Sequence, residues 1–566
     1  MKKINFWHLA LAGILVFTFV LLAVVSKKDS QTTDEGIHLF AGYTYLTKND
    51  FRLDPEHPPF LKEIAALPLL FISNLNAPID GLWEKAGNFY YDSWEEARSM
   101  SESFLYSVGN NADKLLFWGR FPFVILTLLL GLFTYFWANR LYGQKAGVFA
   151  AFLTLFLPNI LAHGHLINTD LGVTFFIFVG LYFWGKYLKQ PAWFDLLLAG
   201  LFIGLAFASK FTSVTIIPIM VVLAVIKLFI DKNAVNWGKY LLGLLGIGII
   251  GFLIVWATYG FSTAAAPVPI GSFSENIRMW ANYNIPTVFD GIFNRFRPYL
   301  IPADFYKGFV LVARHALGGH AAFLLGNTSA QGWWYYFPVA IFYKTPLVFF
   351  VFLGLAIIFF KKIRSKIIFD ELILIIVPVL YLLISMNSKA DLGVRHILPI
   401  FPYLAVFAAK SINLIDLHAF INKRDLKITA AAVIFTGLVG WYFVSSMQSY
   451  PNFLSYFNEA AGGPNGGYKI LTDSNLDWGQ DIKRIKDYID THPNDKIGLT
   501  YPWDGDSALS YYGLKYPLVR PDDIDITGDV IISATYADTD AYSWLWHFPY
   551  EQIMPGIFIF HISEQG

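Results

Sequence analysis

Long apolar runs, separated by short polar connections, dominate the chain before residue 447. A helix that crosses the hydrocarbon core of a bilayer needs about 20 mainly apolar residues. The runs predict about eleven such helices, over residues 5–25, 115–138, 146–163, 168–187, 194–209, 211–230, 239–259, 336–360, 369–386, 396–412 and 427–446. The first run is too long for the core of a signal peptide, and no small-residue cleavage site follows it, so we expect it to remain as the first span.

Lysine and arginine collect in alternate connections between these runs, such as 140–145, 186–189 and 361–366. Cytoplasmic connections of membrane proteins are enriched in these residues, so the pattern predicts an N-terminus inside the cell. Lys27 and Lys28 fall on the outer side and are the exception. An odd number of spans then places the C-terminal segment outside. The Lys-Lys start and the lack of cysteine favour a bacterium, so we expect the bacterial inner membrane.

After residue 447 the apolar runs become short, and Asp, Asn, Gly and Tyr become frequent. The amphipathic stretch 478–489 predicts a helix, and the short apolar runs predict strands. These predicted strands cover residues 468–472, 496–501, 529–535 and 556–562. The expected fold class is a polytopic α-helical membrane protein with a small C-terminal α/β domain outside the cell. Its two domains are a membrane module, 1–447, and the α/β domain, 448–566.

Two long connections fall on the outer side, over residues 26–114 and 260–335. Within the first, residues 60–72 are apolar but too few to span, so we expect a helix in the membrane interface. Composition supports a membrane protein, since 55% of residues are hydrophobic and 15% charged, against about 25% charged in soluble domains. Equal numbers of basic and acidic residues, 42 each, argue against a nucleic-acid partner.

Three carboxylates in the outer connections are candidates for catalysis. Asp34 and Glu35 follow the first span, where a carboxylate in a partly dry cleft can act as a general base. The alternative is a solvated acidic turn that caps a helix. Asp170 opens the fourth predicted helix and is either a second catalytic carboxylate facing Asp34 or a plain N-cap.

Histidines in the same connections are candidates for positioning a substrate. His57 follows Glu56 in a proline-rich segment whose prolines restrict the backbone. The alternative is an ordinary connector. His163 and His165 lie in the turn before Asp170, and either could serve a divalent metal ion, although two histidines make an incomplete ligand set. No cofactor is otherwise indicated.

Four basic side chains near the outer membrane edge suit a phosphate group, namely Lys210, Lys389, Arg395 and His396. Arginine is especially suitable because its fork binds two phosphate oxygens at once. The alternative is that these side chains reach toward lipid headgroups. The sequence contains no P-loop, dinucleotide-binding glycine turn or serine nucleophile elbow.

Together these segments resemble the membrane glycosyltransferases of the GT-C fold, specifically the protein O-mannosyltransferase-like family (glycosyltransferase family 39), and their bacterial members in particular. The segments that carry the resemblance are Asp34-Glu35, Glu56-His57-Pro58-Pro59, the His-x-x-x-x-Asp turn ending at Asp170, residues 204–210, Gly393-Val-Arg-His396 with Leu398-Pro399, residues 455–459 and residues 473–478. The large β-trefoil insertion of the eukaryotic members is absent from the outer connection 260–335, which argues against a protein-mannosylating role.

The resemblance implies an inverting glycosyltransferase that uses a polyprenyl-phosphate-linked sugar as donor. The acceptor hydroxyl would belong to a protein or to a lipid or glycan of the cell envelope. The resemblance implies that Asp34 is the general base, and Arg395 or Lys210 would then stabilise the departing phosphate. Two further hypotheses remain, a transporter or flippase for lipid-linked sugars and a structural membrane protein. The predicted spans carry little charge at their centres, whereas a transport path would be marked by such charges.

Overall fold

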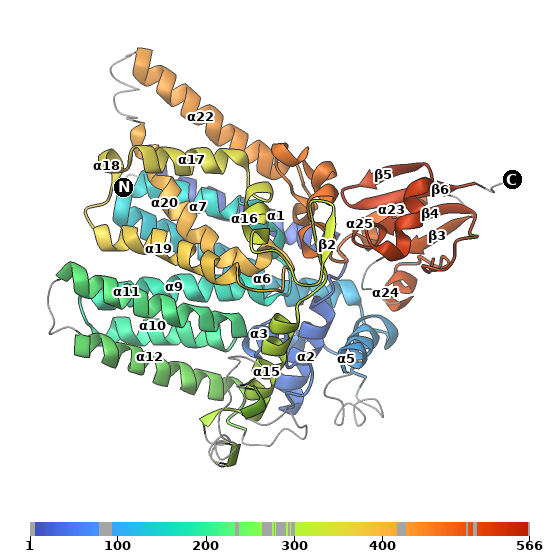
Figure 1. Cartoon of the computed structure of the whole chain (residues 1–566), viewed down its shortest axis with the longest axis horizontal. Coiled ribbons are helices and arrows are strands. Elements are labelled where there is room, and N and C mark those ends of the chain that lie inside the picture. The colour runs from blue at the N-terminus through green and yellow to red at the C-terminus, as the bar shows by residue number, and fades with distance from the viewer. Residues whose placement is uncertain are drawn as a thin grey trace.

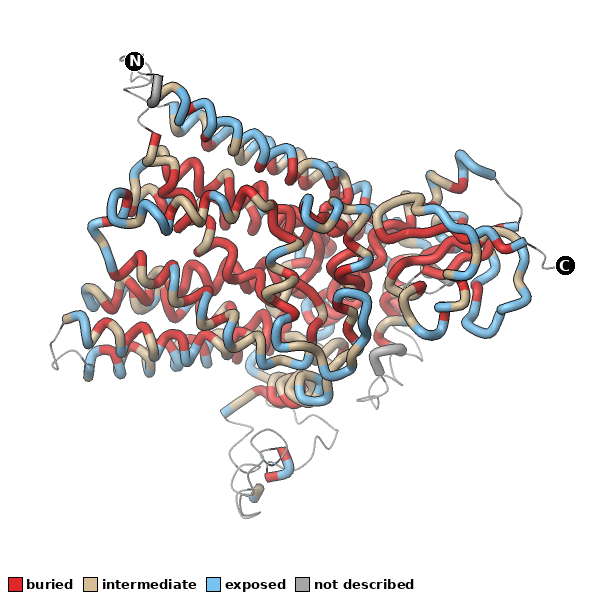
Figure 2. Tube along the Cα trace, turned by 45° about the horizontal axis from the view of Figure 1, so that its top comes forward, coloured by how far each residue is buried: buried red, intermediate tan, exposed pale blue. Residues whose placement is uncertain are grey.

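The computed structural model describes residues 6–78, 93–231, 237–262, 300–415, 426–493, 496–501 and 506–563, with a few isolated positions between 274 and 295. Figure 1 shows the long helices lying side by side in one bundle, with a small sheet beyond one end. Buried residues fill the interior of the bundle and the sheet, and exposed residues lie on the outer helices (Figure 2). The predicted class, a helical membrane protein with a C-terminal α/β domain, is confirmed.

Eight of the predicted spans are present as segments long and apolar enough to cross a membrane, counted over the described residues. They are Phe6–Lys28 (α1), Ala112–Tyr142 (α6), Thr169–Lys189 (α9), Phe211–Asp231 (containing α11, Ile216–Asp231), Trp237–Thr258 (α12), Ile368–Ser385 (α19), Val394–Leu414 (containing α20, Phe401–Ala409) and Thr429–Met447 (within α22, Leu426–Met447). The ends of α11 and α18 (Phe360–Ile363) and the N-terminus lie at the end of the bundle opposite the sheet (Figure 1).

The other three predicted spans are shorter or broken helices. Residues 146–163 form α7 (Gln144–Leu155) and α8 (Pro158–His163), and residues 194–209 form α10 (Trp193–Phe207). The 336–360 run forms α16 (Tyr336–Tyr343) and α17 (Leu347–Ile358), which meet at an angle of 103°. Pro158 and Pro346 lie at these breaks, where a proline cannot donate the helical hydrogen bond and clashes with the preceding turn.

Several short elements cover the end of the bundle nearest the sheet. They are α2 (Glu35–Lys48), α3 (Phe60–Ala66) with the 3₁₀ turn Leu67–Phe71, α5 (Ser93–Glu102), α15 (Ala303–Gly318) and the hairpin of β1 (Ala322–Leu324) and β2 (Asn327–Ser329). The predicted interfacial helix at 60–72 is therefore helical, and Leu67, Leu70 and Phe71 are exposed. A Cβ at Gly42 would lie 2.0 Å from the carbonyl of Lys62, so α2 and α3 pack with their backbones in contact.

The C-terminal domain has a four-stranded sheet in the order β3-β4-β6-β5. Its strands are β3 (Ile497–Thr500), β4 (Gly528–Ser533), β5 (Tyr550–Met554) and β6 (Ile557–Ile562), with β3 and β4 parallel and the others antiparallel. Helices α23 (Ile482–Thr491), α24 (Asp506–Tyr511) and α25 (Ala534–Ala537) complete the domain.

Two expectations for this domain need correction. The strand expected at 468–472 is wrong, because the 3₁₀ helix Pro464–Lys469 and a turn occupy this stretch, and β5 was not predicted. The helix expected from residue 478 begins at Ile482. Trp546 belongs to the domain's core, with its ring centroid 5.3 Å from that of Phe558.

Candidate active site

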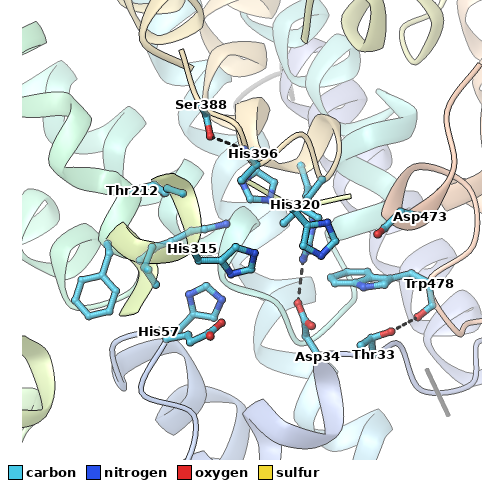
Figure 3. Close-up of a pocket in the computed structure, with 18 residues that line it drawn as sticks. Thr33, Asp34, His57, Thr212, His315, His320, Ser388, His396, Asp473 and Trp478 are labelled. Atoms are coloured by element: carbon cyan, nitrogen blue, oxygen red, sulfur yellow. Dashed lines mark hydrogen bonds and ion pairs between the residues drawn. The ribbon is translucent and has the colours of Figure 1, made fainter. Parts of the chain in front are cut away.

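A cavity of about 410 Å³ lies at the end of the bundle next to the C-terminal domain. Its wall combines the start of α2, the segment before α3, the connection from α10 to α11, α15 and the connection after α19 (Figure 3). The C-terminal residues 448–566, called the tail below, contribute the rest of the wall. The charged, polar and aromatic residues of this wall are Thr33, Asp34, Glu56, His57, Lys210, Phe211, Thr212, His315, His320, Ser388, Arg395, His396, Asp473 and Trp478. Segments separated by hundreds of residues thus meet around one space.

Two cations and two carboxylates alternate at the cavity. Arg395 Nη1 donates to Asp34 Oδ2 at 3.0 Å and lies 3.9 Å from Asp170 Oδ2. Lys210 pairs with the other oxygen of Asp170, which is buried behind the cavity wall. Asn168 caps α9 by accepting from the Asp170 N–H, so Asp170 is not the N-cap. Its side chain instead holds two cations side by side.

Arg395 is also held by an aromatic ring of the tail. Its guanidinium carbon lies 4.0 Å from the ring centroid of Trp478, a cation–π contact that is stronger when water is excluded. The Thr33 N–H and Oγ1 donate to the Trp478 carbonyl at 2.9 and 3.2 Å, as Figure 3 shows for the hydroxyl. The tail is therefore tied to the connection that presents Asp34.

A glycine lets the tail approach the Arg395 segment closely. Gly393 has a φ of +143°, and a Cβ there would lie 2.7 Å from Ser474 Oγ. The Val394 N–H donates to Asn475 Oδ1 at 2.9 Å, and Asn475 Nδ2 donates to Tyr336 Oη at 3.0 Å. Because only glycine adopts this backbone at little cost, the Gly-Val-Arg-His sequence and the 473–478 segment form one continuous wall.

The segment that carries His57 is fixed from behind. Lys62 Nζ donates to Asp54 Oδ2 at 3.2 Å, and His38 Nε2 lies 3.4 Å from the same oxygen. The rings of His38 and His57 meet edge to face, with centroids 5.3 Å apart. The proline-rich segment is thus anchored at its start by buried charges, which agrees with the rigidity expected from its sequence.

Burial sets the protonation of two residues in this segment. Burial, followed by the charge of His38, lowers the pKa of His57 well below its ordinary value, so the imidazole is neutral. Burial, followed by the carboxylates of Asp54 and Asp34, raises the pKa of Glu56 to about 7. Glu56 therefore changes charge near neutral pH, directly at the cavity.

Three buried nitrogen atoms of the wall have no hydrogen-bond partner among the described residues, namely His57 Nδ1, Arg395 Nε and His396 Nε2. Buried polar atoms in folded proteins nearly always have a partner. Their residues line the same cavity, next to two cations. This arrangement suits a ligand that is anionic and rich in oxygen atoms.

Glu35, expected at the site, lies away from the cavity. It is buried and pairs with Arg120, whose Nε donates to Glu35 Oε1 at 2.7 Å. It also accepts from the N–H groups of Thr32 and Ile167, each at 2.9 Å. Burial opposes its ionisation, but the charge of Arg120 outweighs this and keeps the pKa of Glu35 below its ordinary value. All of these contacts are structural.

His165 and Lys389 are also not brought to the cavity wall. His165 Nε2 lies 2.7 Å from Asp29 Oδ2, and its Nδ1 lies 2.9 Å from the Leu161 carbonyl oxygen. The side chain of Lys389 is exposed. Among the described residues, no three His, Asp or Glu side chains are grouped so that they could hold a metal ion, and His163 and His165 therefore lack a third ligand.

An apolar groove of about 240 Å³ adjoins the cavity. Its wall includes Gly248, Phe252 and Trp256 of α12, together with Phe305 from the start of α15. Phe211 lines both the groove and the cavity, so the two spaces share a wall. A ligand with a long apolar chain and a polar head could occupy both.

Several residues of the site were not predicted as such. Asp473 has a φ of +59° and lines the cavity, and α23 begins only at Ile482. Trp478 lies over Arg395. The density of Asp and Asn in the 473–478 segment was the available signal. Thr33 and His320 lie in ordinary polar connections, and no feature of the sequence marked them as residues of the site.

These features define an integral membrane protein with a charged cavity at one end of its helix bundle. Residues 109–256 match the family model described as dolichyl-phosphate-mannose-protein mannosyltransferase. This match confirms the resemblance that the sequence motifs indicated. An uncharacterized protein of Aquifex aeolicus (strain VF5) is 27% identical over 210 residues, which are 33% of this chain and 41% of that protein. The chain thus spans about two fifths of the length of this relative.

The fold is also similar to solved structures of membrane glycosyltransferases. ArnT from Cupriavidus metallidurans, in a crystal structure bound to undecaprenyl phosphate, is 13% identical over 97% of each chain, with a TM-score of 0.48. The oligosaccharyltransferase of Archaeoglobus fulgidus, tethered to an acceptor peptide, is 14% identical over 98% of this chain and 74% of that chain, with a TM-score of 0.43.

Proposed function

We propose that this protein is a glycosyltransferase that moves a sugar from a polyprenyl-phosphate carrier to a hydroxyl group on the non-cytoplasmic face of the membrane, with inversion at the anomeric carbon. The observation that carries the proposal is the cavity's set of unpartnered buried nitrogens, on His57, Arg395 and His396, beside an apolar groove. The matched family model supports the sugar chemistry.

The donor lies across the two connected spaces. Its isoprenoid chain occupies the groove between α12 and α15, and its sugar phosphate enters the cavity. The phosphate accepts from Arg395 Nε and from His396, and it competes with Asp34 for the guanidinium. When the phosphate takes this cation, the carboxylate of Asp34 is released toward the acceptor. Lys210 adds positive charge where the departing phosphate gains negative charge.

Transfer is then a single displacement. The acceptor oxygen forms a bond to the anomeric carbon, Asp34 accepts the hydroxyl proton, and the bond from that carbon to the phosphate oxygen breaks. The lipid phosphate leaves with the electron pair and is stabilised by Arg395. Trp478 and Asp473 of the tail line the same cavity as Asp34 and contact the acceptor. The acceptor belongs to a protein or to an envelope lipid or glycan.

The deciding experiment compares Asp34→Asn with Asp50→Asn, a carboxylate of the same outer connection that pairs with Arg52. Transfer from a polyprenyl-phosphate sugar should fall by about 10²- to 10⁴-fold in the first variant, because a general base contributes about this much. It should stay near the wild-type rate in the second. Full activity of Asp34→Asn would move the base to another residue, with Asp170 the next candidate.

The donor class has its own test. Purified protein should hydrolyse or transfer from a polyprenyl-phosphate sugar and ignore nucleotide sugars, because the sequence has no nucleotide-binding loop. Efficient turnover of a nucleotide sugar without a lipid carrier would refute the donor class. It would leave the assignment of Asp34 to be judged separately by the variant above.

A further inference from the structure

A second polar pocket, of about 530 Å³, lies at the outer end of α1 between the start of α6 and α23. It shares no lining residue with the cavity of the candidate active site. Its wall carries five cations and two carboxylates, namely Lys27, Lys28, Lys483, Arg484 and Lys486 against Asp113 and Asp487. The pocket therefore has a positive wall at the expected level of the outer membrane surface.

Of the five cations that line this pocket, Lys27 and Lys28 of α1 have no acidic partner among the described residues. The other three cations are paired, Lys483 with Asp113, Arg484 with Asp29 and Asp481, and Lys486 with Asp490. In the described part of the chain no carboxylate lies within ion-pair distance of Lys27 or Lys28. Their ammonium groups lie 5.1 Å from the ring centroid of Phe117 and 5.2 Å from that of Tyr450, respectively.

An apolar stripe leads along α1 to these lysines. Val16, Val20 and Val24 are 63%, 53% and 38% exposed. Residues four apart lie above one another on a helix, so the stripe continues directly into Lys28. In a bilayer this face of α1 lies against acyl chains, and its last position presents a cation at the surface.

We infer that this pocket binds the anionic phosphate headgroup of an outer-leaflet lipid, whose acyl chain lies along the valine stripe of α1. Charge complementarity favours this occupant, since Lys27 and Lys28 run against the usual scarcity of cations in outer connections. Cations near a membrane surface attract anionic lipids additively. The site is distinct from the donor groove, so it does not depend on the proposed function.

The competing explanation is local. Lysines at the last turn of a helix interact favourably with its dipole and can reach headgroups of any kind. The two explanations differ in what they require of the lipid. A headgroup site distinguishes anionic from neutral lipids through Lys27 and Lys28, whereas a helix-end effect contributes equally in both.

The test measures the ratio of phosphatidylglycerol to phosphatidylcholine that stays bound to the full-length protein after purification from equimolar mixed micelles, by native mass spectrometry. Wild type should retain phosphatidylglycerol preferentially. The K27Q/K28Q variant should lower the ratio by about tenfold, because two surface cations are lost. The matched control is K361Q/K362Q, an adjacent exposed lysine pair at the opposite end of the bundle, which should leave the ratio unchanged.

Two further measurements keep the inference falsifiable if the glutamine variant folds poorly. K27R/K28R should retain the preference, and 0.5 M salt should weaken it in wild type, since screening acts on surface charges. Equal loss in K361Q/K362Q, or no preference in wild type, would overturn the inference. Displacement of the bound lipid by millimolar glycerol phosphate would also overturn it, because the site would then take a free phosphate.

Discussion

Arg395 contacts three residues of the candidate site, since it pairs with Asp34, approaches Asp170 and lies on Trp478. Together, Arg395 and Lys210 are paired with the carboxylates of Asp34 and Asp170. An entering phosphate must therefore replace a carboxylate at Arg395 rather than fill an uncompensated positive site. In the proposed mechanism, this exchange frees the carboxylate of Asp34 when the donor binds.

The buried pair of Glu35 and Arg120 yields a prediction about stability. Glu35→Gln leaves the Arg120 guanidinium buried without a countercharge, which costs about 3–5 kcal/mol of unfolding free energy when a buried pair is broken. The effect should appear as a lower midpoint in thermal or denaturant unfolding in detergent. Asp50→Asn, which breaks a more exposed pair with Arg52, is the matched control and should unfold within about 1 kcal/mol of wild type. Equal stability of the two variants would contradict the structural role of Glu35.

A second prediction concerns pH. Below its pKa of about 7 the Glu56 carboxyl is neutral, and it becomes an anion as the pH rises through that value. The new negative charge lies beside the phosphate site, so the KM for the donor should rise from pH 6 to pH 8, by about fivefold for a charge in a partly buried site. Glu56→Gln should flatten this rise.

Glu63 provides the control for this measurement. Burial also raises its pKa to about 7, but it lies in α3 and does not line the cavity. Glu63→Gln should leave the pH profile of the KM unchanged. If both variants flatten the profile, the pH effect acts through the fold and not through the donor site.

The sequence could predict the candidate site only in part, for a geometric reason. Polar residues in outer connections identified Asp34, His57 and Arg395, which line the cavity, although their catalytic roles stay predictions. Glu35 could not be separated from Asp34, because neighbouring residues at a helix start point about 100° apart and only one can face the cavity. His165 and Lys389 share their connections with site residues, yet contacts at long range decide which way their side chains point.

At the scale of elements, the groove between α12 and α15 gives a prediction about the donor's chain. Gly248 lines the groove, and a Cβ there would meet nothing within 4 Å. Gly248→Leu should therefore fill the groove without straining the fold and raise the KM for a long-chain donor by about tenfold, the cost of displacing one or two buried methylenes. A donor with a very short chain should be affected less.

The matched variant is on the same helix. Gly238 also has open space around its Cβ position but does not line the groove. Gly238→Leu should leave the KM for every donor near the wild-type value. A rise in both variants, or in neither, would mean that the lipid chain binds elsewhere.

Hydropathy predicted the existence of the long helices well and their integrity less well. Residues 336–360 form one continuous apolar run in the sequence, and hydropathy cannot show that this run folds as two helices that meet at 103°. The break depends on Pro346 and on the contacts of Lys344, which donates to the Leu454 carbonyl at 2.7 Å. Leu454 lies far from Lys344 in the sequence, so a hydropathy pattern cannot reveal this contact. The strand expected at 468–472 failed for the same reason, since Tyr468 packs on Trp546 and Phe558 and the Ile470 carbonyl accepts from the N–H of Leu325, all of them distant in sequence.

The whole molecule presents a prediction about orientation. The chain has no cysteine, so single cysteines can be labelled without background. Asp522→Cys, at an exposed turn of the C-terminal domain, should react with a membrane-impermeant maleimide in intact spheroplasts. Lys361→Cys, at the other end of the bundle, should react only after permeabilisation. The reverse pattern would invert the topology and place the cavity in the cytoplasm.

The ties between the tail and the first outer connection also impose an order of events during synthesis. Ser30 Oγ donates to the Gly479 carbonyl at 2.8 Å, across 449 residues of sequence. At about 5–20 residues per second, the ribosome needs on the order of a minute to produce the second partner after the first. For that interval the connection carrying Asp34 has been inserted but lacks its wall. Under the proposed function, the site of a nascent chain is therefore incomplete until its tail has been made, so the chain order itself would prevent premature glycosyl transfer or donor hydrolysis.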